Sequence, residues 1–130
     1  MSLLSVNSPF HPVDPGRVVL ETDEAVAFYD AYPITEGHAL VVPKQRVSSL
    51  FELKPDIQTA VWDAVRLTRE FLAKEYHTDS FNIGINDGRA AGQTITHTHI
   101  HVIPRFKGDA PDPRGGIRWI MPDRANYWDR

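Results

Sequence analysis

Cysteine is absent from all 130 residues, which excludes disulfide bonds and thiolate metal ligands. No stretch approaches the roughly 20 consecutive apolar residues that a membrane-spanning helix requires. The first 16 residues also lack the basic region and apolar run of a secretory signal. We therefore expect a cytoplasmic protein that does not bind a membrane and whose fold depends on packing and hydrogen bonds.

Excess positive charge is also missing. The formal net charge is -3 and the isoelectric point is near 6.0, so the chain has no electrostatic footprint for extended nucleic acid. With 42% hydrophobic residues, the length suits one compact core. We predict a single domain over residues 1–130, with an irregular proline-containing arm over 1–16 and a C-terminal tail over 108–130.

The periodicity of apolar residues predicts an α+β fold. Two-residue alternation and turn-forming residues indicate five strands. Apolar residues at three- and four-residue spacing, starting after a proline, indicate one long helix. The expected strands cover 17–23, 25–33, 38–44, 80–86 and 96–104, and the expected helices cover 47–53 and about 56–76.

Three histidines alternate with other residues in the last expected strand, "THTHIHVIP". Successive side chains of a strand point to opposite faces, so His97, His99 and His101 share one face, with neighbouring rings roughly 7 Å apart. Ile100 and Val102 share the opposite face, where the long helix should pack. A histidine cluster of this kind indicates chemistry more often than a solvated strand face.

Two chemistries fit three aligned imidazoles. They could bind a transition metal, or one could act as a nucleophile while the others orient it and bind the anion under attack. Residues 86–105 contain a single acid, Asp87, whereas a catalytic zinc usually has further ligands and a base nearby. The same segment is rich in groups that can donate to phosphate oxygens: Asn86, Gly88, Gly92, Gln93 and Thr94. These neighbouring donor groups favour phosphorus chemistry over metal binding.

The stretch "GQTITHTHIHVIPR" resembles the signature of the histidine triad (HIT) family, and "YDAYPITEGHALVVPK" and "NIGINDGRAAGQT" resemble its upstream blocks. The "IPR" that follows the triad is similar to the dinucleoside polyphosphate hydrolase branch and its bacterial relatives. The resemblance implies a five-stranded antiparallel sheet, one long and one short helix, and a homodimer. Many bacterial members carry a zinc-binding Cys-x-x-Cys pair where this chain has "SPFHPV", so no metal site is expected.

The resemblance also implies roles for individual residues. His99 would attack the α-phosphorus of a nucleotide and His101 would contact the α-phosphate, with His97 and His38 in support. Asp30 would accept the ribose hydroxyls, and Phe28, together with Phe10, could hold a purine, although Phe28 is equally expected as plain core. The remaining nucleotide-binding residues would be Asn86, Gly92, Gln93, Thr94 and Ile95. No cofactor is required, and Mg²⁺ would only accompany the polyphosphate.

Two other functions stay open on the sequence. The chain could be a nucleotide-binding module without turnover, or a metal-dependent hydrolase that uses the three histidines as ligands. The tail forms a further hypothesis, since Arg114 or Arg118 could approach the substrate beyond the α-phosphate, across the dimer. The alternative is that the tail only packs on the dimer.

Overall fold

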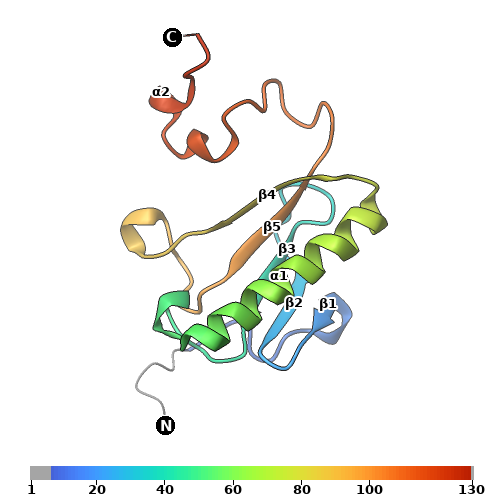
Figure 1. Cartoon of the computed structure of the whole chain (residues 1–130), viewed down its shortest axis with the longest axis vertical. Helices are drawn as coiled ribbons and strands as arrows, with labels where there is room; N and C mark the ends of the chain where they lie inside the picture. The colour runs from blue at the N-terminus through green and yellow to red at the C-terminus, as the bar shows by residue number, and fades with distance from the viewer. Residues whose placement is uncertain (1–6, 130) are drawn as a thin grey trace.

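The computed structural model describes residues 7–129. Five antiparallel strands form one sheet in the order β1-β2-β3-β5-β4, and a long helix, α1, crosses one face of it (Figure 1). The predicted α+β fold with a five-stranded antiparallel sheet is confirmed. The strands are β1 (Val18–Glu21), β2 (Ala25–Tyr29), β3 (Ala39–Pro43), β4 (Ser80–Ile85) and β5 (Ile100–Arg105), and α1 spans Pro55–Tyr76.

Helix α1 starts and ends where the sequence predicts, to within a residue. Pro55 occupies the first turn, where its missing amide costs nothing, and His77 ends the helix in the left-handed conformation. The buried side of α1 packs against Ile100, Val102 and the alanine-rich inner faces of β2 and β3. Phe71 is an apolar residue of α1 that does not belong to this side, because it is 41% exposed.

The opposite face of the sheet has a smaller core covered by the N-terminal arm. Val26, Phe28, Leu40 and Val42 are buried there, and Phe10 packs over them together with Val13. The arm is irregular, as predicted for residues 1–16, up to a short 3-10 turn over Pro15–Arg17. Residues 1–6 lie outside the described residues. The arm therefore lies on the sheet face that the histidines share.

Three elements differ from the expectation by the largest margins. The short helix predicted over 47–53 is a single 3-10 turn, Leu50–Glu52, held by a capping box between Ser49 and Glu52. Strand β2 ends at Tyr29 instead of continuing to residue 33, because the Asp30 carboxylate accepts the Tyr32 amide and turns the chain. Strand β5 begins at Ile100, four residues later than predicted.

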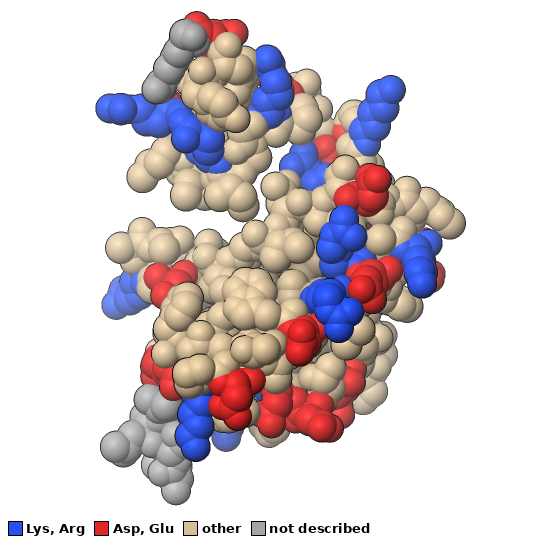
Figure 2. Space-filling model, viewed as in Figure 1, with Lys and Arg blue, Asp and Glu red and all other residues tan. Residues whose placement is uncertain are grey.

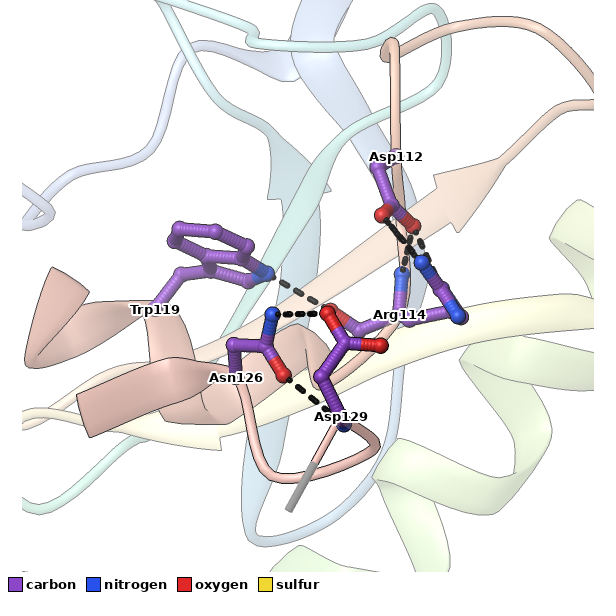
Figure 3. Close-up of polar contacts among 5 residues, drawn as sticks. All are labelled: Asp112, Arg114, Trp119, Asn126 and Asp129. Carbon is purple, nitrogen blue, oxygen red and sulfur yellow. Dashed lines mark hydrogen bonds and ion pairs between the residues drawn. The ribbon is translucent and has the colours of Figure 1, made fainter. Parts of the chain in front are cut away.

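The tail leaves the body of the domain after β5 (Figures 1 and 2). It contains a 3-10 turn, Gly116–Ile120, and a short helix, α2 (Pro122–Ala125), which the sequence did not predict. Figure 3 shows how it is held internally: the Asp112 carboxylate accepts from Arg114, and the Trp119 indole donates to the Arg114 carbonyl at 2.7 Å. Across the described residues no helix combines the length and the hydropathy needed to cross a bilayer.

Candidate active site

The chain entering β5 is held by contacts other than sheet pairing. The last β3–β5 pair is Val41 with Ile100. Beyond it, the His97 ring replaces a backbone donor, since His97 Nε2 donates to the Pro43 carbonyl at 2.8 Å, and the Thr98 amide donates to the Val47 carbonyl at 2.8 Å. These bonds explain why the ladder starts late while the two-residue alternation of side chains continues through the histidines.

The position of His99 is fixed by the residue two places before it. His99 Nδ1 donates to the His97 carbonyl at 3.0 Å, so in the neutral ring Nε2 carries no proton. The Phe10 ring stands edge-on to the His99 ring, with centroids 5.4 Å apart. His99 is therefore held as an imidazole whose free lone pair is its Nε2 atom.

A relay of hydrogen bonds sets the proton of His101 in the opposite way. The Ile34 amide donates to His38 Nδ1 at 3.2 Å, so the proton of a neutral His38 lies on Nε2. That Nε2–H donates to His101 Nδ1 at 3.0 Å, which places the proton of His101 on its own Nε2. The site therefore has one imidazole that can attack and one that can donate.

Burial keeps the supporting imidazoles neutral. Desolvation lowers the pKa of His38 and of His97 below the ordinary value. The pKa of His101 falls to about 4, first because of burial and then because of the neighbouring rings of His99 and His38. Asp30 lies 3.5 Å from His38 and opposes these shifts only in part. At neutral pH His101 thus donates from a neutral ring.

His99 and His101 face one cavity of about 400 Å³. Asp30 lies on its wall, as do four of the residues expected to bind phosphate, namely Asn86, Gly92, Thr94 and Ile95. The amides of Thr94 and Ile95 have no hydrogen-bond partner among residues 7–129, so both remain available to an anion. Gly92 has a φ of +96°, a conformation that favours glycine and that shapes this loop.

Two of the expected binding residues do not line the cavity. Gln93 uses its side-chain amide within the loop, donating to the Ser48 and Ile95 carbonyls and accepting from the Gly88 amide. Phe28 is 1% exposed and lies beneath Phe10, so it is core rather than a free stacking surface. Both side chains are therefore engaged in contacts within the protein, although the resemblance implied that they would bind the nucleotide.

The structure adds Arg17, Tyr32, Leu40 and Pro9, which line the same cavity and which the sequence did not single out. Phe10, which the sequence analysis paired with Phe28, lines the cavity as well. Outside the cavity, Ser8 Oγ lies 2.5 Å from His97 Nδ1 and donates to it, because the Nε2 atom of that ring already donates. Arg17 directly precedes β1, whose residue Val18 pairs with Phe28. Only this pairing of β1 with β2 shows that Arg17 lies near the site, so a local sequence pattern could not have identified it.

The model of the HIT domain matches residues 11–108. The chain belongs to the HIT family. It is 40% identical to the asymmetrical bis(5'-nucleosyl)-tetraphosphatase of Schizosaccharomyces pombe over 72% of this chain and 51% of that protein. It is 40% identical to an adenylylsulfatase of Arabidopsis thaliana over 73% of this chain and 48% of that protein. The chain thus spans about half the length of these two curated relatives.

The fold agrees with a solved HIT structure. A member of the family from Bacillus subtilis superposes with a TM-score of 0.72 at 29% identity, over 80% of this chain and 77% of that one. The match supports the sheet order and the position of α1 on which the description of the site rests.

The possible metal ligands in this HIT chain differ from those the sequence suggested. Asp30, His38 and His101 each offer a ligand atom within 4.8 Å of the others, and only His101 belongs to the triad. The Ile34 amide, however, donates to His38 Nδ1 and so keeps the proton on Nε2, the atom that would have to bind the metal. The donor set is therefore poorly suited to a metal without rearrangement of this turn.

Among the described residues, no tail arginine of the HIT chain lines the cavity. Arg114 pairs with Asp112 and lies over the Trp128 ring, 4.5 Å from its centroid. Arg118 donates to the carbonyls of Arg124 and Ala125. Arg130 lies outside the described residues.

Proposed function

We propose that the chain is a nucleotide hydrolase that cleaves at the α-phosphate through a nucleotidyl-histidine intermediate and releases a nucleoside monophosphate. The observation that carries the proposal is the pairing of opposite tautomers in one cavity. His99 presents an unprotonated Nε2 atom, and His101 presents an Nε2–H donor beside it. A nucleophile next to a donor for the phosphate is the arrangement that covalent phosphoryl chemistry requires.

The first step joins His99 to phosphorus. The Nε2 lone pair attacks the α-phosphorus, a nitrogen–phosphorus bond forms, and the bond from phosphorus to the leaving-group oxygen breaks with its electron pair on that oxygen. His101 Nε2–H donates to the oxygens that gain charge, and the free amides of Thr94 and Ile95 bind the non-bridging oxygens. The His97 carbonyl stabilises the positive charge that develops on the His99 ring.

The second step returns the enzyme to its starting state. Water attacks phosphorus from the side that the leaving group has vacated and releases one proton to the solvent, while the nitrogen–phosphorus bond breaks and its electron pair returns to His99 Nε2. The products are a nucleoside monophosphate and a regenerated neutral imidazole. Asp30, on the same cavity wall, is placed to accept the ribose hydroxyls throughout.

We propose a dinucleoside polyphosphate as the substrate, with other adenylated compounds as related substrates. The S. pombe relative is named for tetraphosphate cleavage and the A. thaliana relative for adenylylsulfate cleavage, so the two names share the nucleotidyl group and differ in the leaving group. The "IPR" after the triad supports the polyphosphate. Mg²⁺ would enter with the polyphosphate rather than as a resident ion.

The decisive experiment combines the His99→Ala variant with direct detection of the intermediate. Turnover of diadenosine tetraphosphate should fall by roughly three orders of magnitude or more, while the variant stays folded because Ile100 and Val102 are untouched. Wild-type enzyme quenched in alkali should carry a nucleotidyl mass on the peptide containing His99, since nitrogen–phosphorus bonds survive base.

The matched control is His77→Ala, which removes an exposed histidine at the end of α1. Near wild-type turnover by the His99 variant would exclude covalent catalysis, and nucleotide binding without turnover by the wild type would favour a binding module. Activity lost on chelation and restored by a stoichiometric transition metal would instead favour the metal-dependent hydrolase.

A further inference from the structure

The cavity has a cationic side chain, Arg17, which does not belong to the loop of Thr94 and Ile95. Arg17 precedes β1 and lines the cavity with Phe10 and Leu40, and it is the only lysine or arginine on this wall among residues 7–129. No carboxylate of the described residues lies within ion-pair distance of its guanidinium. Its charge therefore has no partner within the described part of the domain.

Only one edge of the Arg17 guanidinium is used by the protein. Nε and one terminal nitrogen both donate to the Tyr29 carbonyl, at 3.1 and 2.8 Å. The plane of the group is held over the Phe28 ring, 5.4 Å from its centroid. The edge formed by the two terminal nitrogens retains two parallel N–H donors. The Arg17 guanidinium, called the fork below, is thus held in place while the N–H groups of its two terminal nitrogens remain available to a ligand.

The sheet register places this fork where a nucleobase would lie. His101 pairs with Leu40, Leu40 with Phe28, and Phe28 with Val18, next to Arg17. These pairs cross three strand spacings of about 4.8 Å each, a distance comparable to that from the phosphorus of a nucleotide to the far edge of its base. The leaving group departs opposite His99 Nε2, so it does not compete for this direction.

We propose that Arg17 reads the base of the bound nucleotide and selects guanine over adenine. Guanine presents two adjacent acceptors, O6 and N7, which match the two free N–H groups of a guanidinium fork. Adenine offers N7 beside the N6 amino donor, so one of the two bonds is replaced by two opposed donors. The inference rests on the proposed function for the direction of the nucleotide, and its test does not require turnover.

The experiment measures the dissociation constants of GMP and AMP by calorimetry for the wild type and for Arg17→Lys and Arg17→Met. The wild type should bind GMP at least tenfold more tightly than AMP, which corresponds to about 1.4 kcal/mol. Both variants should bring the ratio close to one. Arg17→Lys keeps the charge and lacks the fork, so a preserved preference in that variant would show attraction by charge alone and overturn the proposal.

Each variant is compared with Arg66→Met, which removes an exposed arginine on α1. If Arg17 only supported the Tyr29 carbonyl, its loss would weaken both ligands equally and lower the Tm, leaving the ratio unchanged, and the proposal would be wrong. Equal or tighter binding of AMP by the wild type would also overturn it. A guanine preference without hydrolysis would exclude the proposed hydrolase activity and support recognition of the base by Arg17. Hydrolysis without a preference would support the hydrolase activity and exclude recognition of the base by Arg17.

Discussion

His101 sits among groups that make protonation of its ring unfavourable. Burial, His99 and His38 all lower its pKa, which reaches about 4, and only Asp30 acts in the other direction. An unfolded histidine titrates near 6.5, so between about pH 6.5 and 4 the unfolded chain binds a proton that the folded chain does not. Burial lowers the pKa of His38 and His97 in the same direction.

We therefore predict that the free energy of unfolding is fully present above about pH 7 and decreases as the pH falls toward 5. Each of these histidines contributes up to about 1.4 kcal/mol per pH unit within its window. Urea unfolding followed by circular dichroism at pH 7, 6 and 5 measures the change. His101→Gln should show a shallower pH dependence than the wild type, and a midpoint that stays constant from pH 7 to 5 would contradict the prediction.

At the residue scale, the sequence indicates which side chains carry the chemistry better than which ones are free to use it. The spacing of the triad places His99 and His101 on one face, and the structure brings both to the cavity. Gln93 and Phe28 carry suitable groups, but hydrogen bonds within the loop and the cover of Phe10 occupy them. Arg17 does not belong to any recognisable sequence motif. Its place beside the cavity follows from the pairing of β1 with β2, which a local sequence pattern does not specify.

The N-terminal arm contacts His97 through the Ser8 hydroxyl, in addition to placing Phe10 against His99. Ser8 Oγ donates to His97 Nδ1 and itself accepts the Phe10 amide, so one residue orders both the arm and the ring. His97 in turn supplies the carbonyl that orients His99. The arm is thereby linked to His99 through two hydrogen bonds, one to the His97 ring and one from the His97 carbonyl.

We predict that Ser8→Ala lowers kcat by about three- to tenfold with little change in KM. The variant leaves the buried Nδ1 atom of His97 without its donor, a cost of about 1–3 kcal/mol to the folded state. Steady-state kinetics and thermal unfolding measure the two effects. The control is Ser80→Ala, which removes an exposed hydroxyl at the start of β4 and should change neither. A rise in KM with kcat unchanged would show that the arm binds substrate instead of orienting His99.

At the element scale, the alternation of residues predicts faces more reliably than strand ends. The pattern from Thr96 to Pro104 is continuous, so it predicts one strand, yet pairing begins only at Ile100. The reason lies on the neighbouring strand, where the His97 ring takes the Pro43 carbonyl that would otherwise accept a backbone amide. Helix α1, whose ends are signalled by a proline and a change of period, is predicted almost to the residue.

At the scale of the whole molecule, α1 and the tail each expose several large apolar side chains. On α1, Trp62 is exposed on one flank of the buried side and Leu67 and Phe71 on the other. The tail exposes a second group, consisting of Ile117, Trp119, Ile120, Met121 and Tyr127. Few charged side chains occupy the middle of the face drawn in Figure 2. The homodimer stays a prediction, and if it forms, the apolar surface of the tail is a candidate part of its interface.

We predict that a chain ending at Lys107 still forms nucleotidyl-enzyme but loses discrimination among leaving groups. The tail makes its polar contacts largely within itself, so the cavity and the histidine relay stay in place without it. Relative rates across polyphosphate, sulfate and amine leaving groups measure the effect, with light scattering to record the oligomeric state of each preparation. Identical relative rates for the full and shortened chains would rule out this role, and a shortened chain that is monomeric and inactive would assign the tail to assembly.

The three tryptophans are distributed in a way that has a spectroscopic consequence. Trp119 and Trp128 belong to the tail and Trp62 to the outer flank of α1, while none of the three lines the nucleotide cavity. Indole emission shifts to shorter wavelength when its ring leaves water. Nucleotide that only fills the cavity should therefore leave the fluorescence of the protein unchanged, and a blue shift on adding nucleotide would signal that the tail or the flank of α1 has become covered.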